Sequence, residues 1–183
     1  GRNNDVQGNR RSQSDNRQQM VQQLSSQMSP EELYRVQLQQ AKEMQLFHQR
    51  EFEMAECIEH ERTNEFIAIL KKMSRDQVCK LYLTVDRFGY TLIHQCAFFG
   101  NLQILEILID AFKLNFRQFI NYSNQKVKNG QATGQIFTVK QIENQIKVVI
   151  QNWVNQQTLM QDGWTALHLA CRKGSSDIFM FLL

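Results

Sequence analysis

The chain has 183 residues, 42% of them hydrophobic, which is enough for one elongated domain with a tail. Its formal net charge of +3 favours no particular class of partner. No run of about 18 apolar residues occurs, so we expect no membrane span here. The four cysteines form no C-x-x-C pair, and Cys57-x-x-His60 has no second pair of zinc ligands after it. We therefore expect a reduced, intracellular, cytoplasmic protein with no metal or other cofactor.

Residues 1–28 consist mainly of Gln, Asn, Ser and Arg, with few apolar side chains. Such a segment cannot bury enough apolar surface to offset the entropy that it would lose on ordering. We therefore predict a disordered tail over 1–28. Its spaced arginines lack accompanying aromatic residues and are weak evidence for nucleic-acid binding, so no nucleic-acid partner is expected.

A long helix is predicted over residues 29–63. Ser29 can cap it, Pro30 suits the first helical position, and Glu32 can close a capping box. Neither Gly nor Pro occurs between residues 31 and 73, and a break near Thr63 is possible. A heptad register can be drawn, but three of its seven core positions are polar, so a coiled coil is only weakly indicated. Dimerisation through this helix is possible but not favoured.

Residues 64–85 have the pattern of a short helix pair. Phe66, Ile69 and Leu70 are apolar, and Ser74-x-x-Gln77 is a second capping box before another short apolar stretch. We interpret this pair as a degenerate unit that caps a stack of similar units.

Two later stretches repeat one pattern in the same register. The first copy spans 86–100 and the second spans 160–174; both contain G-x-T-x-[LI]-H-x-[AC]-[AC]-x-x-G, with matching positions 74 residues apart. Gly89 and Gly163 suit a turn with positive φ, and Thr91 and Thr165 can cap the helix that follows. This pattern resembles the ankyrin repeat, whose signature contains T-P-L-H-x-A.

The resemblance implies an all-α fold: a short solenoid of helix-turn-helix repeats, here at 86–120 and 157–183. It also implies that His94 and His168 are structural and form hydrogen bonds between loops, with no catalytic or metal-binding role. No phosphate-binding loop, G-x-S-x-G or kinase motif occurs, so no catalytic residue is predicted and the chain is not expected to be an enzyme.

The spacing of 74 residues does not fit ankyrin repeats, which recur about every 33 residues. A hidden middle repeat would need its first helix near 124–133, but that segment is polar and lacks the T-x-L-H pattern. We therefore predict an insertion over 121–156. Thr138-x-x-Gln141 and the apolar spacing that follows predict an amphipathic helix over 139–155. Its apolar stripe could fold back on the repeats, dock a partner, or, less plausibly given its two lysines, bind a membrane surface.

The resemblance implies a protein partner on the concave face, which is built from loop tips and first helices. Transferred position by position, this gives ten partner-binding residues: Arg87, Phe88, Tyr90, Gln95, Phe98, Phe99, Trp164, Leu169, Arg172 and Lys173. Exposed aromatic residues with arginine are typical of binding hot spots. The alternative for Phe98 and Phe99 is packing against the long helix, which would then cover the face and inhibit binding.

The chain stops within the second helix of the last repeat, and we expect it to be a fragment of a larger protein. The favoured function is a non-catalytic protein-interaction module of the ankyrin type. One alternative is the regulatory segment of a truncated enzyme or ion channel, such as a kinase or an acyltransferase. Another is a structural assembly protein, for example in cilia, that works through its long helix.

Overall fold

The computed structural model describes residues 29–159 and 163–183, so the predicted tail over 1–28 lies outside the described residues. The chain divides into two units, one up to His48 and one over Gln49–Leu183. Eight α-helices and one short 3-10 helix make up the regular structure of the described residues, and no strand occurs among them. The predicted all-α class is confirmed.

The described part of the first unit is a single exposed stretch of helix. Helix α2 (Pro30–Glu59) begins at the predicted capping box: the Glu32 amide donates to Ser29 Oγ at 3.2 Å, and the Ser29 amide donates to the Glu32 carboxylate at 2.9 Å. None of residues 29–48 is buried. This part of the helix therefore depends on its cap and on pairs along its own surface.

Helix α2 ends within the second unit, four residues earlier than predicted. Glu61 adopts a left-handed conformation at φ 55°, and the Arg62 amide donates to the carbonyl of Cys57 at 2.8 Å. The last two turns bury Met54, Cys57 and Ile58 in the core of the second unit. Met54 and Ile58, which the heptad register would place at core positions, are thus used for packing within the chain.

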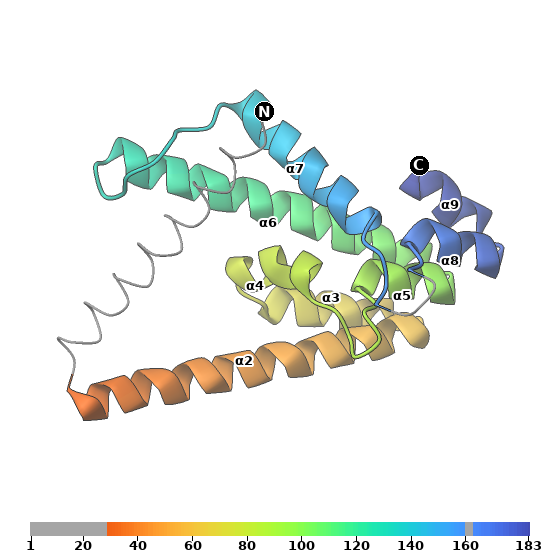
Figure 1. The fold of residues 1–183 in the computed structure, drawn as a ribbon, viewed down its shortest axis with the longest axis horizontal. Helices are drawn as coiled ribbons and strands as arrows, with labels where there is room; N and C mark the ends of the chain where they lie inside the picture. The colour runs from red at the N-terminus through yellow and green to blue at the C-terminus, as the bar shows by residue number, and fades with distance from the viewer. Residues whose placement is uncertain (1–28, 160–162) are drawn as a thin grey trace, which may run out of the picture. The chain divides into compact units, whose positions relative to one another are not determined.

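Three helix pairs form the repeat stack (Figure 1). They are α3 (Thr63–Lys72) with α4 (Arg75–Lys80) and the 3-10 helix η1 (Leu81–Leu83), α5 (Leu92–Phe99) with α6 (Leu102–Lys128), and α8 (Ala166–Lys173) with α9 (Ser176–Leu182). Helix α5 packs against α8, and α4 packs against α6. In these two contacts a first helix stacks on a first helix and a second helix on a second, as in a solenoid.

Helix α6 is longer than a repeat requires. The predicted repeat ends at residue 120, but α6 continues to Lys128, because the first residue that interrupts a helix is Gly130. The segment where a hidden repeat was considered therefore starts as the last turn of α6. The boundary predicted at residue 121 lies inside this helix.

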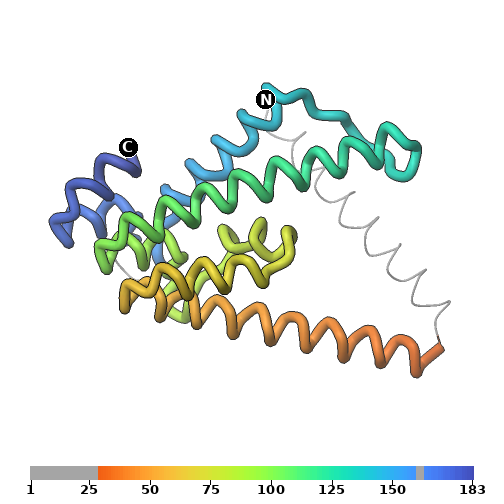
Figure 2. Tube along the Cα trace, turned by 180° about the vertical axis from the view of Figure 1, so that it is seen from behind, coloured from red at the N-terminus to blue at the C-terminus, as the bar shows by residue number. Residues whose placement is uncertain are grey.

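Helix α7 (Val139–Val154) lies along the extended part of α6, and the two helices are side by side in both views (Figures 1 and 2). Ile142 and Ile146 pack against Ile120 of α6. Arg117 of α6 donates two hydrogen bonds to the carboxylate of Glu143, at 2.7 and 3.1 Å. The observed helix agrees with the one predicted over 139–155, and its apolar stripe folds back on the chain.

The end of α7 is anchored in the repeat stack by Trp153. This side chain is buried, and its ring lies 5.5 Å from Phe112 of α6 and 6.5 Å from Tyr82 of η1, in edge-to-face contacts. Burial of a large apolar side chain contributes roughly 1.5–3 kcal/mol to folding. The helical insertion is therefore part of the core that also holds the repeats.

Candidate functional site

The loop tip of the first copy is held by Asp86. Its carboxylate accepts hydrogen bonds from the amides of Phe88 at 2.8 Å and Tyr90 at 2.9 Å, and its own amide donates to the carbonyl of Tyr90. Gly89 completes the turn at φ 82°. The turn leaves Arg87 and Phe88 exposed, with the guanidinium of Arg87 4.6 Å from the centre of the Phe88 ring.

His94 fixes this loop to the next one. The ring is buried, and its Nδ1 accepts a hydrogen bond from the Thr91 amide at 3.1 Å. Its Nε2 lies 2.8 Å from the carbonyl oxygen of Gln156, which can only accept, so Nε2 carries the proton. Burial lowers the pKa of His94 from its usual value, and the neutral ring holds two loops together. The structure therefore agrees with the structural role that the family resemblance implied.

A groove of 440 Å³ opens beside this loop, and we name it the aromatic groove. Its walls come from three elements: the last two turns of α2, the 86–90 loop and α5. The residues that line it are Phe52, Ala55, Glu56, Glu59, Asp86, Phe88, Tyr90, Gln95, Phe98 and Phe99. Such a volume is within the range of ordinary ligand pockets.

Half of the residues that line the aromatic groove are aromatic. Phe98 and Phe99 meet edge to face at 5.1 Å, and Tyr90 lies edge-on to His94 at 6.0 Å. Phe52 is 65% exposed, Phe98 is 45% exposed and Phe88 is 42% exposed. The end of α2 thus forms one wall of the groove, and Phe98 on the α5 side stays 45% exposed.

The polar groups of the aromatic groove include four acceptors from side chains that carry no positive charge, beside the hydroxyl of Tyr90. Three carboxylates, those of Glu56, Glu59 and Asp86, belong to the lining, which contains neither Lys nor Arg. The side-chain oxygen of Gln95 is buried and accepts no hydrogen bond from any described residue. The arrangement can receive hydrogen-bond donors and positive charge, flanked by apolar surface.

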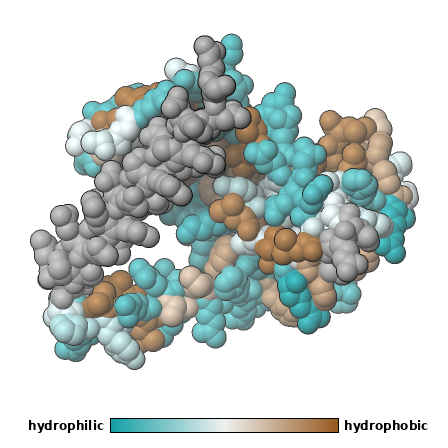
Figure 3. All heavy atoms as spheres, viewed as in Figure 1, coloured by the Kyte–Doolittle hydropathy of each residue, from teal (hydrophilic) through white to brown (hydrophobic). Residues whose placement is uncertain are grey.

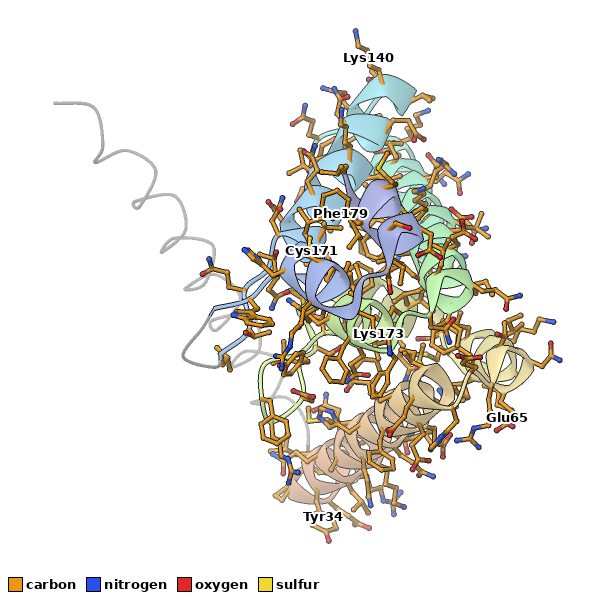
Figure 4. All side chains as sticks on the ribbon, turned by 90° about the vertical axis from the view of Figure 1, so that its right-hand side faces the viewer. Tyr34, Glu65, Lys140, Cys171, Lys173 and Phe179 are labelled. Carbon is orange, nitrogen blue, oxygen red and sulfur yellow. The ribbon has the colours of Figure 1, made fainter. Side chains whose placement is uncertain are left out.

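Five of the ten predicted partner-binding residues line the aromatic groove: Phe88, Tyr90, Gln95, Phe98 and Phe99. Arg87 lies over Phe88 at its edge. In the second copy Arg172 and Lys173 are exposed and Trp164 is half-buried; the guanidinium of Arg172 lies 4.9 Å from the centre of the Trp164 ring. Lys173 ends α8 on the side that approaches Gly100 at the end of α5 (Figure 4).

The prediction for Leu169 needs correction. Its side chain is 1% exposed, because α8 turns this face towards α5 in the repeat stack. A residue at this depth contributes packing and cannot contact a partner.

One wall of the aromatic groove is made by residues of α2 that were not among the predicted partner-binding residues. Phe52, Glu56 and Glu59 follow the i, i+4, i+7 spacing of one helix face, opposite the buried residues of the same two turns. That spacing was visible in the sequence. Its position opposite α5 depends on tertiary packing.

Three of the four cysteines, Cys57, Cys79 and Cys96, are buried or half-buried. Burial raises the pKa of the thiol of Cys79 to about 11 and also raises the pKa values of Cys57 and Cys96, so these thiols stay protonated. Within 29–159 and 163–183, no group of three His, Cys, Asp or Glu side chains is placed to hold a metal ion.

Comparison with known proteins gives one family. The family model described as ankyrin repeats (3 copies) matches residues 59–183, the segment that contains the three helix pairs. A search of curated proteins found no significant match to this chain. Among the helices of the described residues, none combines the length and the apolar character needed to cross a membrane. Ankyrin repeats generally serve as protein-interaction modules and are typically non-catalytic. The match covers more than half of the chain, and the protein belongs to the ankyrin-repeat family.

Proposed function

We propose that this protein is a non-catalytic protein-interaction module whose partner binds in the aromatic groove. The observation that carries the proposal is the convergence of exposed rings from three separate elements, with Phe52 on α2, Phe88 on the loop and Phe98 on α5. Single exposed apolar residues are ordinary on protein surfaces, whereas a hollow lined by several of them is typical of a binding site.

The aromatic groove has the composition of a binding hot spot. Aromatic residues and arginine supply most of the free energy in protein interfaces, and they act best inside partly enclosed pockets. Arg87 beside Phe88 adds this second residue type at the edge of the groove. A partner segment that fills the groove would gain apolar burial from rings on two helices and on a loop that is already fixed by hydrogen bonds to Asp86.

A stable interface buries about 800 Å² on each partner, more than a single groove supplies. The 86–90 loop lies against the segment that leads into the second copy, since a side chain at Gly89 would overlap the backbone of Leu159. We propose that Trp164, Arg172 and Lys173 extend the contact from the groove to the second copy.

A photo-crosslinking amino acid placed at position 98 of the full chain should capture the partner in cells. The affinity of that partner is then measured with purified variants. Phe98→Ala and Phe52→Ala should each weaken binding about tenfold or more, because each removes an aromatic wall. Tyr34→Ala is the matched control, since Tyr34 lies on the same helix as Phe52 and is also 65% exposed (Figure 4).

A partner whose affinity is the same for Phe98→Ala, Phe52→Ala and Tyr34→Ala would refute this function for the groove.

A deletion variant must keep the residues of α2 that are buried in the core. Removal of residues 1–60 would take away Met54, Cys57 and Ile58, which are buried, so a shortened chain should begin at or before Gln49.

A further inference from the structure

The aromatic groove is acidic in a chain whose formal net charge is positive. Glu56, Glu59 and Asp86 line it, and no basic residue does. Glu56 is partly balanced by Arg62 at 3.8 Å, whereas Glu59 forms no ion pair with any described residue. The groove therefore attracts positive charge.

The walls of the groove suit a cation with an apolar stem. The face of an aromatic ring carries negative charge density and attracts guanidinium and ammonium groups. The loop itself contains one such pair, because the guanidinium of Arg87 lies over the ring of Phe88. Phe52, Phe98 and Phe99 offer further rings to the aliphatic part of a basic side chain.

Gln95 adds a requirement for a hydrogen-bond donor. Its side-chain oxygen is buried and has no donor among the described residues, which is unfavourable while it remains so. Gln95, Glu56 and Glu59 line the same groove, so acceptors are available there from both α5 and α2. A guanidinium has five N–H donors in a fixed plane and can serve several acceptors at once, which a compact ammonium does less well.

We propose that the aromatic groove binds an arginine side chain from an extended segment of the partner, with an apolar neighbour in the same segment. The guanidinium meets Gln95 and the carboxylates of Glu56 and Glu59, and its methylene stem lies against the aromatic rings. This inference rests on the proposed function, of which it specifies the partner chemistry.

The test uses short acetylated peptide amides and the full chain labelled with ¹⁵N. The probe carries one phenylalanine next to one arginine between alanines; a second peptide replaces arginine with citrulline, which has the same shape and no charge, and a third replaces it with lysine. NMR titration should show shifts at the side-chain amide of Gln95 and the backbone amides of Phe88 and Tyr90. Replacement of arginine by citrulline should weaken binding about tenfold.

Variants locate the effect in the groove. Glu59→Gln should weaken the arginine peptide about threefold, because it removes one exposed carboxylate without change in shape. Glu106→Gln, an exposed residue of α6 outside the groove, makes the same change in net charge and should leave the affinity unaltered. Equal affinity for the arginine and citrulline peptides, equal effects of the two Gln variants, or a tighter lysine peptide would overturn the proposal.

Failure of this inference and failure of the proposed function give different results. If the captured partner is lost with Phe98→Ala and Phe52→Ala but is indifferent to Glu59→Gln, the groove binds a partner and the arginine assignment is wrong. If the aromatic variants do not weaken the captured partner, the groove is not the binding site, and the proposed function fails together with the inference.

Discussion

The two copies of the repeated motif form the same local structure in different surroundings. In both, a capping box joins a threonine to the histidine three residues later, with the threonine hydroxyl 2.9 Å from His94 Nδ1 in the first copy and 2.8 Å from His168 Nδ1 in the second. In the first copy Thr91 and His94 are buried, whereas His168 is exposed. The motif alone thus determines the cap, and burial comes from the neighbours.

The neighbours that bury the first copy can be named. Helix α5 packs between α6 and α8, and the loop after α7 brings the carbonyl of Gln156 to His94. Around the second copy, the described residues bring no carbonyl to Nε2 of His168. Helix α9 also leaves Met180, Phe181 and Leu183 exposed, and Figure 3 shows apolar surface over this helix. Although the two copies share one motif, the first copy should therefore contribute more to the free energy of unfolding than the second.

The largest difference is expected at the first glycine of each copy. Gly89 lies at φ 82°, and a Cβ there would overlap the backbone nitrogen of Leu159. Gly89→Ala combines left-handed strain with a clash against backbone and should cost about 3 kcal/mol in the free energy of unfolding. Among the residues that the structure describes, the side chain of Gln157 is the one near Gly163 (φ 55°), at 3.6 Å, so Gly163→Ala should cost about 1 kcal/mol from strain alone.

Urea denaturation of the two variants, followed by circular dichroism, gives both values on one scale. The midpoint of Gly89→Ala should fall well below that of Gly163→Ala at unchanged slope. Equal losses would mean that the 86–90 loop does not pack on the following loop as described.

A smaller difference is expected at the histidines. His94→Ala leaves the buried amide of Thr91 and the carbonyl of Gln156 without their partner, and should cost about 2–3 kcal/mol. His168→Ala removes bonds at an exposed cap and should cost about 1 kcal/mol or less. The same denaturation assay compares the two, and a loss for His168→Ala that matches the loss for His94→Ala would contradict the difference in burial.

Helix positions followed from local chemistry and could be predicted. The boxes at Ser29, Ser74 and Thr138 begin helices where the sequence indicated. The length of α6 was underestimated because the repeat pattern suggested an end near residue 120, whereas no Gly or Pro occurs between Leu102 and Gly130. A family pattern thus gave a worse boundary than the local rule for glycine.

The site was predictable only in part, because it joins elements that are distant in sequence. Gln95 and Leu169 occupy equivalent positions of the two copies, and both were expected to face a partner. Packing of α8 against α5 buries Leu169, whereas Gln95 lines the aromatic groove. The wall made by Phe52, Glu56 and Glu59 could not be placed from the sequence, since no local rule fixes how α2 docks on α5.

The smallest predicted effect is a pH dependence that belongs to the buried copy. Burial lowers the native pKa of His94 below its usual value of 6.5. Below that pH the unfolded chain therefore binds a proton at His94 more strongly than the native chain does. Stability is therefore complete above about pH 6.5 and falls as pH is lowered through the interval below it, by at most about 1.4 kcal/mol per pH unit from this group. His94→Asn keeps an acceptor for the Thr91 amide but cannot titrate. Urea midpoints measured between pH 7.5 and 5.0 should therefore fall more steeply for the natural chain than for His94→Asn. Parallel dependences of the urea midpoint on pH in the two proteins would show that His94 binds a proton equally well in the native and the unfolded chain. That result would contradict the lowered pKa expected from its burial.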